Sequence, residues 1–186
     1  MFIIKNTYYF YIENKQNINF KKINKNKKIN IIYRNNGKAE SLEKIKKFRY
    51  ACKLKGFKFY ISNNIKLLKY CRGDGLYLSS YNKKNHLNSK FNLIGSAHNF
   101  KEINQKFKQG CKTIILSRLF KTTYTNKKSF LGILKFNLLI KHYPINLIPL
   151  GGIRSNNLLK LNLVNGLGFA LFSEIKKKPA ISNRLF

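Results

Sequence analysis

Short apolar runs typical of β-strands alternate with helical patterns along the whole of this chain. Alternation of this kind favours a parallel sheet, because two consecutive parallel strands need a crossover connection that a helix usually provides. Eight repeats of the strand–helix unit, spaced by roughly 20–25 residues, predict an α/β fold of the (β/α)8 TIM barrel class. The expected strands are residues 8–12, 29–33, 57–61, 75–78, 91–94, 113–116, 146–150 and 168–172.

Signals for helix ends support the same order of elements. Ser41 and Asn99 are placed to cap helices, and Glu102 completes a capping-box pattern with Asn99. In that second helix, Ile103 and Phe107 are expected to face the core. Further helical patterns cover a short stretch around residues 65–68, residues 130–140 and residues 158–163.

The chain is short for a barrel, since about 250 residues are typical and this sequence has 186. Its first crossover, residues 14–28, is rich in Lys and Asn and predicts only a weak helix. We expect one domain over residues 1–186 with its core at about 8–175. The alternative architecture is a doubly wound open sheet, which would hold its ligand at a topological switch point.

The charge of the chain is strongly one-sided. There are 38 basic residues against six acidic ones, for a formal net charge of +32. The codon bias of an AT-rich genome would explain much of the lysine excess, but not the lack of acids. A field this positive favours anionic partners, such as phosphorylated metabolites, RNA or acidic membrane surfaces. With so few acids, the chain can hardly build a carboxylate dyad or a multi-carboxylate Mg²⁺ site.

Cysteine spacing predicts neither a disulfide framework nor a zinc site. Cys52, Cys71 and Cys111 lack CxxC or CxxH spacing and are expected to be small buried thiols. The start of the chain has no signal-peptide pattern, and no apolar run approaches membrane-spanning length. We therefore expect a cytoplasmic protein without a membrane partner.

A glycine-rich segment near the C-terminus is the most informative local signal. Ile148–Asn157 is typical of a strand end, a Gly-Gly turn and a helix start, and residues 166–173 of a second strand that ends in Phe-Ser. Paired glycines let the backbone approach a ligand closely, and free amides of a following helix can hold a phosphate. These strand ends match the phosphate site after the seventh and eighth strands of a (β/α)8 barrel. An ordinary strand-to-helix crossover is the alternative for this segment alone.

Seven strand-end motifs occur in order along the chain. They are Ile31-Ile-Tyr-Arg34, Phe59-Tyr-Ile-Ser-Asn-Asn64, Asp74-Gly-Leu-Tyr-Leu78, Ile94-Gly-Ser-Ala-His98, Leu116-Ser-Arg-Leu-Phe-Lys-Thr122, Pro149-Leu-Gly-Gly-Ile153 and Phe172-Ser173. In this order and spacing the chain resembles the thiamine phosphate synthase and TenI family over about residues 8–175. The fold of that family is a (β/α)8 barrel, which is the architecture that the alternation also predicts.

The resemblance implies a class of reaction. Synthase members of the family join hydroxymethylpyrimidine diphosphate to thiazole phosphate with Mg²⁺, which gives thiamine phosphate and pyrophosphate. TenI-like members isomerise a thiazole carboxylate phosphate or have no assigned activity. We therefore expect a transferase with phosphorylated pyrimidine and thiazole substrates, and a homodimer is one candidate assembly.

Two other functions remain as alternatives. The first is a TenI-like isomerase or a non-catalytic binder of a phosphorylated ligand. The second is a basic nucleic-acid-binding protein, which the charge suggests. No signature of an RNA-binding module supports the second alternative.

The resemblance also implies roles for individual residues. Arg34 and Ser96 would be catalytic, because negative charge grows on the leaving diphosphate and both side chains can donate hydrogen bonds to it. The substrate-binding residues would be Ser62, Asn63, Thr122, Lys127, Gly151, Gly152, Phe172 and Ser173.

Several family positions carry other residues in this chain. Asn63 and Asn82 occupy the places of two Mg²⁺-binding aspartates. An uncharged amide oxygen is a weak ligand for Mg²⁺, so we expect metal binding to be weak or absent. Ile32 and Tyr77 replace a glutamine and a histidine of the family pattern. Either basic side chains take over the charge of the metal, or the protein catalyses something other than the standard condensation.

Overall fold

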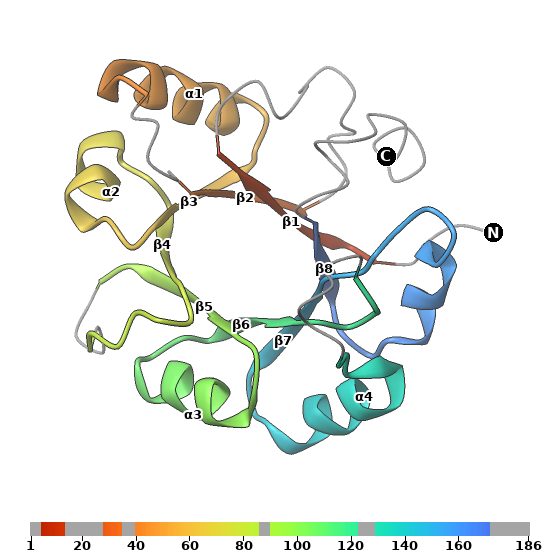
Figure 1. The fold of residues 1–186 in the computed structure, drawn as a ribbon. Helices are drawn as coiled ribbons and strands as arrows, with labels where there is room; N and C mark the ends of the chain where they lie inside the picture. The colour runs from red at the N-terminus through yellow and green to blue at the C-terminus, as the bar shows by residue number, and fades with distance from the viewer. Residues whose placement is uncertain (1–4, 14–27, 35–39, 86–89, 123–128, 172–186) are drawn as a thin grey trace.

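Eight parallel strands close into a barrel in the computed structural model of this chain, which describes residues 5–13, 28–34, 40–85, 90–122 and 129–171 (Figure 1). Each strand pairs with the next one along the sequence, and β1 pairs with β8 to complete the ring. The strands are β1 (Thr7–Ile12), β2 (Lys28–Tyr33), β3 (Lys58–Ser62), β4 (Gly75–Leu78), β5 (Asn92–Ala97), β6 (Thr113–Ser117), β7 (Asn146–Leu150) and β8 (Gly168–Leu171). The (β/α)8 prediction is confirmed. The open-sheet alternative is wrong, because an open sheet would leave β1 and β8 unpaired.

Helices surround the barrel on its outside (Figure 1). They are α1 (Leu42–Leu54), α2 (Ile65–Cys71), α3 (Phe100–Lys108), α4 (Gly132–His142) and the 3₁₀-helix η3 (Leu158–Leu163). Asn99 caps α3 by accepting a hydrogen bond from the amide of Glu102, and the Glu102 carboxylate accepts one from the amide of His98. The predicted Asn99 cap is present, and Glu102 reaches back as expected, but its carboxylate bonds the amide of the residue before the cap. Ser41 precedes α1 as expected, but its side chain makes no capping hydrogen bond.

The inward face of α3 differs from the sequence prediction at one position. Phe107 is 48% exposed, whereas Lys106 is fully buried. Gly95 of β5 explains the exchange, because a Cβ atom there would lie 2.9 Å from Cβ and Cγ of Lys106. The lysine methylenes pack into the space that this glycine leaves open. The prediction that Phe107 faces the core is wrong.

The core has two parts, on either side of the strands. Outward-facing strand residues pack against the helices, as Phe10, Ile31 and Phe59 do. Inward-facing residues fill the barrel, since successive side chains of a strand point to opposite faces. The barrel interior consists of Tyr9, Tyr11, Ile32, Tyr60, Tyr77, Ile94, Ile115, Ile148 and Ala170. Tyrosines therefore lie inside the barrel with isoleucines between them.

The chain is shorter than a typical barrel because some connections between its strands are short. Between β7 and β8 the only helix is the six-residue η3. The expected helix at residues 158–163 therefore exists, but it is a 3₁₀-helix. The weak crossover at residues 14–27 and the end of the chain from residue 172 lie outside the described residues. In the part of the chain that is described, no helix has the length and hydropathy needed to cross a bilayer.

Candidate functional site

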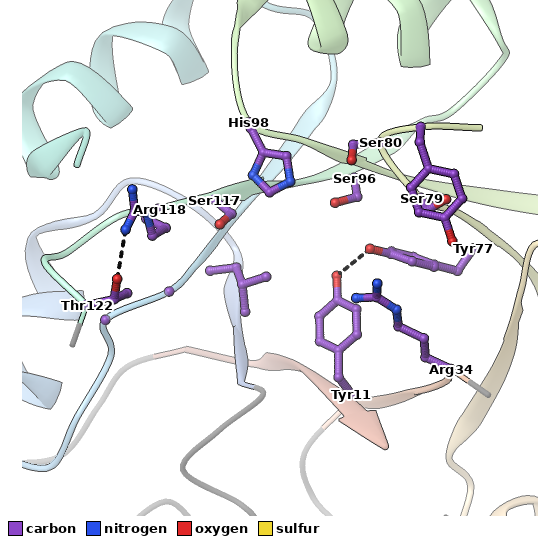
Figure 2. A pocket seen from close by; sticks show the side chains of 14 residues that line it. Tyr11, Arg34, Tyr77, Ser79, Ser80, Ser96, His98, Ser117, Arg118 and Thr122 are labelled. Atoms are coloured by element: carbon purple, nitrogen blue, oxygen red, sulfur yellow. Dashed lines mark hydrogen bonds between the residues drawn. The ribbon is translucent and has the colours of Figure 1, made fainter. Parts of the chain in front are cut away.

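A cavity of about 260 Å³ opens where the strands end at the C-terminal mouth of the barrel. In a parallel barrel all strands end on the same side, so residues far apart in sequence meet there. The cavity receives side chains from the ends of β1, β4, β5, β6 and β7, and Arg34 directly after β2 (Figure 2). Its position is that of the active site in characterised (β/α)8 enzymes.

Hydroxyl groups form a connected wall on one side of this cavity. The phenol of Tyr11 donates a hydrogen bond of 3.0 Å to the phenol of Tyr77, and the two rings meet edge to face with centroids 5.4 Å apart. Ser96, which is buried, hydrogen-bonds Tyr77 in turn. Burial raises the pKa of both Tyr11 and Tyr77. Both phenols therefore stay neutral at physiological pH and act as hydrogen-bonding groups.

Cationic side chains reach the cavity from two directions. Arg34 follows β2, where its amide donates a hydrogen bond to the carbonyl of Ile12 at 2.8 Å. Arg118 follows β6, and its guanidinium donates to Oγ1 of Thr122 at 2.8 Å and to the carbonyl of Ser129 at 2.9 Å. Figure 2 shows Arg34 beside the tyrosine pair and Arg118 on the opposite side.

The charge of this lining has one sign. His98 also lines the cavity, between the two arginines in Figure 2, and among the described residues no Asp or Glu lines it. Guanidinium groups donate hydrogen bonds in a planar fork that matches phosphate oxygens. The cavity is therefore suited to a ligand with more than one anionic group.

The Gly-Gly turn after β7 packs tightly against the segment after β6. Gly151 and Gly152 have positive φ angles of 94° and 70°. A Cβ atom on Gly152 would lie 2.3 Å from the carbonyl oxygen of Phe120, so only glycine fits this close approach. The amide of Phe120 donates to the carbonyl of Gly151 at 3.0 Å, which joins the two segments into one wall. None of the described residues accepts a hydrogen bond from the amide of Gly152, which lines the cavity.

The helix expected directly after this turn is absent. The chain instead makes a turn in which the Asn157 side chain donates to the carbonyl of Gly152 and accepts from the amide of Arg154, both at 2.8 Å. The 3₁₀-helix η3 begins only at Leu158. The prediction of helix amides next to the glycines is therefore wrong, because the asparagine closes a local turn instead.

Asn63 and Asn82 lie next to each other beside the C-terminal mouth. Nδ2 of Asn82 donates to Oδ1 of Asn63 at 2.9 Å, and the amide of Ser79 donates to the same oxygen at 3.1 Å. Oδ1 of Asn82 accepts from the amide of Lys84 at 3.0 Å. Both side-chain oxygens are thus engaged within the protein.

These residues do not fit a magnesium ion. Mg²⁺ prefers carboxylate oxygens in an octahedral arrangement, and the asparagine oxygens carry no charge. Within the described ranges, no group of three or more His, Cys, Asp or Glu residues could hold a metal ion. The charge that the described lining can supply to an anionic substrate comes from Arg34 and Arg118.

The structure brings five of the residues with predicted roles to the cavity lining. They are Arg34, Ser96, Thr122, Gly151 and Gly152. Ser62 and Asn63 do not line the cavity, but Asn63 donates a hydrogen bond to Oγ of Ser79, which does. Lys127, Phe172 and Ser173 lie outside the described residues.

Sequence reasoning assigned no role to several residues of the lining. Arg118 is the clearest case, although it lies within a quoted strand-end motif. Tyr11 could have been found from the alternation along β1, which places it on the same face as Tyr9. Ser79, Ser80, Tyr81, His98 and Ser117 also line the cavity. The signal available for them was their position at or just after a strand end.

The sequence model of the family described as thiamine monophosphate synthase matches residues 21–175. No curated protein sequence matches this chain significantly.

Solved structures of low sequence identity share the fold. Thiamine phosphate pyrophosphorylase from Pyrococcus furiosus superposes with a TM-score of 0.71 at 12% identity, over 97% of this chain and 93% of that one. The enzyme of the same description from Bacteroides thetaiotaomicron gives 0.61 at 13% identity, over 94% and 84%. Phosphoribosyl anthranilate isomerase from Thermotoga maritima gives 0.68 at 11% identity, over 98% and 97%. At such identities the structural likeness establishes the barrel and not the reaction.

Proposed function

Because this chain belongs to the thiamine monophosphate synthase family, we propose that it is a transferase that joins hydroxymethylpyrimidine diphosphate to thiazole phosphate, giving thiamine phosphate and pyrophosphate. The observation that carries this proposal is the pair Arg34 and Arg118, which line one cavity at the C-terminal mouth. Two arginines, with no carboxylate among the described lining residues, fit two phosphorylated substrates better than neutral or cationic ones.

The reaction exchanges a C–O bond for a C–N bond. The thiazole nitrogen supplies an electron pair to the methylene carbon of the pyrimidine, and the diphosphate leaves with the electrons of the broken C–O bond. Negative charge grows on the leaving oxygen during this step. Arg34 and the hydroxyl of Ser96 would stabilise that charge more strongly in the transition state than in the bound substrate. No proton has to move, which suits a wall of neutral phenols.

The opposite side of the cavity would bind the second substrate. Arg118 lies beside the Gly-Gly turn, because a Cβ atom on Gly151 would be 2.9 Å from its Cγ. The thiazole phosphate would accept hydrogen bonds from this guanidinium and from the amide of Gly152. The two anionic groups would then lie on different sides of the cavity, with the reacting atoms between them.

The cation requirement of this enzyme would differ from that of the family. Since the oxygens of Asn63 and Asn82 are engaged in hydrogen bonds, the proposed reaction draws on the charge of Arg34 and Arg118. We expect weak dependence on Mg²⁺ or none, and no step of the proposed mechanism uses the metal.

An activity assay with both substrates tests the proposal. Purified protein should form thiamine phosphate, and Arg34→Gln should lower turnover by about 10²–10³-fold, the usual effect of losing one donor to a developing anion. Lys47→Gln, on the exposed face of α1, is the matched control and should leave the rate unchanged. No product at high enzyme loading, with or without Mg²⁺, rejects the synthase function.

A TenI-like isomerase or a phosphate-ligand binder is the second candidate. The replaced family positions Asn63, Tyr77 and Asn82 favour it, because they alter the site and leave the Gly-Gly turn intact. If this function is correct, thiazole phosphate alone should raise the melting temperature, and Arg118→Gln should remove the shift. Gly152→Val is a poor test, since the close contact with Phe120 would disturb folding.

Nucleic-acid binding stays an alternative that the missing RNA-binding signature disfavours, and a homodimer stays a candidate assembly. A salt titration of RNA binding addresses the first, because phosphate contacts make affinity fall with salt. Light scattering of the purified protein addresses the second.

A further inference from the structure

A second cavity, of about 620 Å³, lies at the opposite end of the barrel, where the strands begin. It is lined by the first residues of β1, β2, β3, β5 and β6. Buried side chains inside the barrel separate it from the C-terminal cavity, with Ile32, Ile115 and Ile148 in the middle. We call this second cavity the N-terminal mouth. In most (β/α)8 barrels this end serves stability alone.

Four lysines surround the N-terminal mouth. Lys28 begins β2, Lys58 begins β3, Lys90 precedes β5 and Lys112 precedes β6, and all four line the cavity and are exposed. They come from four separate segments of the chain, so their convergence is a product of the fold and not of a local run of lysines.

Strand alternation places two of these lysines in register with the barrel interior. Lys28 stands four residues before Ile32 of β2, and Lys58 stands two residues before Tyr60 of β3, and both Ile32 and Tyr60 are interior positions. Lys90 likewise stands four residues before Ile94 on the path into β5. Because side chains two apart share a face of a strand, Lys28 and Lys58 belong to the inward-facing rows, whereas Lys90 lies just before its strand.

The acidic residues that the structure describes lie away from this mouth or are already paired. Glu102 caps the start of α3, and Glu40 accepts a hydrogen bond from the Tyr33 phenol at the end of β2. Asp74 precedes β4, but its carboxylate accepts from Arg49 at 3.0 Å and from the amide of Phe59 at 2.7 Å. No described acid lines the N-terminal mouth.

Neutral donors complete the lining. The hydroxyl of Tyr9, on the buried floor of the mouth, hydrogen-bonds Thr113, and Asn30 is a buried amide beside them. A concave wall of one charge sign on a low-dielectric floor concentrates the potential inside it. Lysine ammonium groups bind phosphate oxygens as point charges and do not demand one fixed geometry.

We infer that the N-terminal mouth is a binding site for a polyphosphate chain, separate from the proposed transferase site. Its ligand is a compact anion with three or more negative charges, either free inorganic triphosphate or the triphosphate of a nucleotide. A monophosphate would engage too few of the four lysines to be held.

The inference is tested by calorimetric titration of this chain with inorganic triphosphate. The titration is done at about 0.15 M salt, where charges on exposed groups are screened beyond about 8 Å. The mouth variant combines Lys28→Gln, Lys58→Gln and Lys90→Gln. The control combines Lys47→Gln, Lys101→Gln and Lys135→Gln, which removes the same charge from exposed positions on α1, α3 and α4. The Arg34→Gln/Arg118→Gln variant removes binding at the other end.

The mouth variant should bind triphosphate at least tenfold more weakly than the wild type. The control should change the affinity less than twofold, and the arginine variant should retain the site. Equal losses in the mouth variant and the control would overturn the inference, because net charge alone would then explain binding. Loss of all binding in the arginine variant would overturn it too.

Two further measurements keep the result unambiguous. The alternative is that the lysines at this end stabilise the fold by complementing the C-terminal carbonyls of α1 and α3. In that case the mouth variant would have a lower melting temperature than the wild type and the same affinity for triphosphate. That result also contradicts the inference. Titration with metal-free ATP distinguishes the two sources of ligand. If ATP and inorganic triphosphate bind with equal affinity, the site recognises the phosphate chain alone, and if ATP binds more tightly, the site recognises a nucleotide. Both results support the site, and its existence does not depend on the transferase activity.

Discussion

Asn63 is the residue that most restricts the chemistry of the C-terminal mouth. Both ends of its side-chain amide are used, since Nδ2 donates to Oγ of Ser79 at 2.8 Å and Oδ1 accepts from Ser79 and Asn82. Its backbone holds a positive φ of 53°, which asparagine tolerates better than most residues. Asn63 therefore fixes the segment around Ser79 and is not poised to bind a metal.

Restoring two carboxylates at this place should create a metal response. In the Asn63→Asp/Asn82→Asp variant two negative charges face each other, so the melting temperature should fall by about 2–4 °C for each kcal/mol of repulsion. Millimolar Mg²⁺ should recover the loss and raise the Mg²⁺ dependence of turnover. Thermal melts with and without Mg²⁺ measure this.

The matched control is Asn64→Asp/Asn104→Asp, which adds the same charge at two exposed positions, the N-cap of α2 and the middle of α3. If both variants respond to Mg²⁺ alike, the ion acts on net charge, and the paired placement of Asn63 and Asn82 has no bearing on metal binding.

The cysteine thiols should be inert in the folded protein. Burial raises the pKa of Cys52 and of Cys111 to about 12, from a model-compound value of 9.0. At pH 8 both therefore remain protonated thiols without access to solvent, and a thiol-specific reagent should label them only after unfolding in guanidinium. Rapid labelling of the native protein at pH 8 would contradict the buried positions.

The same pKa shifts predict a loss of stability in alkali. A thiol whose folded pKa is raised contributes stability that is fully present below pH 9 and is lost as the pH rises toward 12. The free energy of unfolding from urea titrations should fall over that window. The Cys52→Ala variant should show a shallower fall than the wild type, and an equal slope in both proteins would count against the shift.

At the scale of elements, the lysine in the middle of α3 joins this helix to the C-terminal cavity. The ammonium of Lys106 donates to the carbonyl of Asn82 at 2.6 Å and to Oε1 of Gln109 at 2.9 Å. Gln109 also donates to the carbonyls of Asn82 and Lys84. The segment that follows β4 and lines the cavity is thus held by a helix packed on the neighbouring strand.

Replacing this lysine should loosen the cavity wall. Lys106→Met keeps apolar packing over Gly95 but removes the charged donor, so stability should fall by about 1–2 kcal/mol. Hydrogen exchange should accelerate in residues 79–85 and stay unchanged in α1. Lys108→Met, at an exposed position of the same helix, is the control. Uniform acceleration across the protein would mean that the lysine supports only global stability.

The apolar pattern alone does not correctly predict which face of α3 is buried. The apolar pattern predicts an inward-facing Phe107, because a lysine is expected in solvent. The long stem of a lysine can be buried when its ammonium finds acceptors, and here one acceptor is the carbonyl of Asn82, which is distant in sequence, and the other is Gln109 at the end of α3. Gly95 within β5 was the available signal, since glycine in a strand often marks a close approach.

For the molecule as a whole, the sequence predicted the barrel because alternation and strand-end motifs both point to the same topology. The eight strands were found within a few residues of their observed bounds. Arg34, Ser96 and the glycines could be placed at the cavity because parallel strands all end on one side. Arg118 and the hydrogen bond between Tyr11 and Tyr77 could not, since strand alternation gives the face on which Tyr11 lies but not which side chain it meets.

The distribution of charge is likewise a property of the whole molecule. A net charge of +32 says nothing about where anions bind. The fold concentrates basic side chains at both mouths of the barrel, with Arg34 and Arg118 at one end and four lysines at the other. Only the first of these mouths carries the residues that resemble a family site.

The most direct test of the proposed active site is a crystal structure with thiazole phosphate and pyrophosphate bound. We predict one anion beside Arg34 and Ser96 and the thiazole phosphate between Arg118 and the amide of Gly152, both within hydrogen-bonding distance. The assignment of this site would be contradicted if the anions bound only outside the C-terminal cavity, or if the cavity held no ligand at saturating concentrations of both compounds.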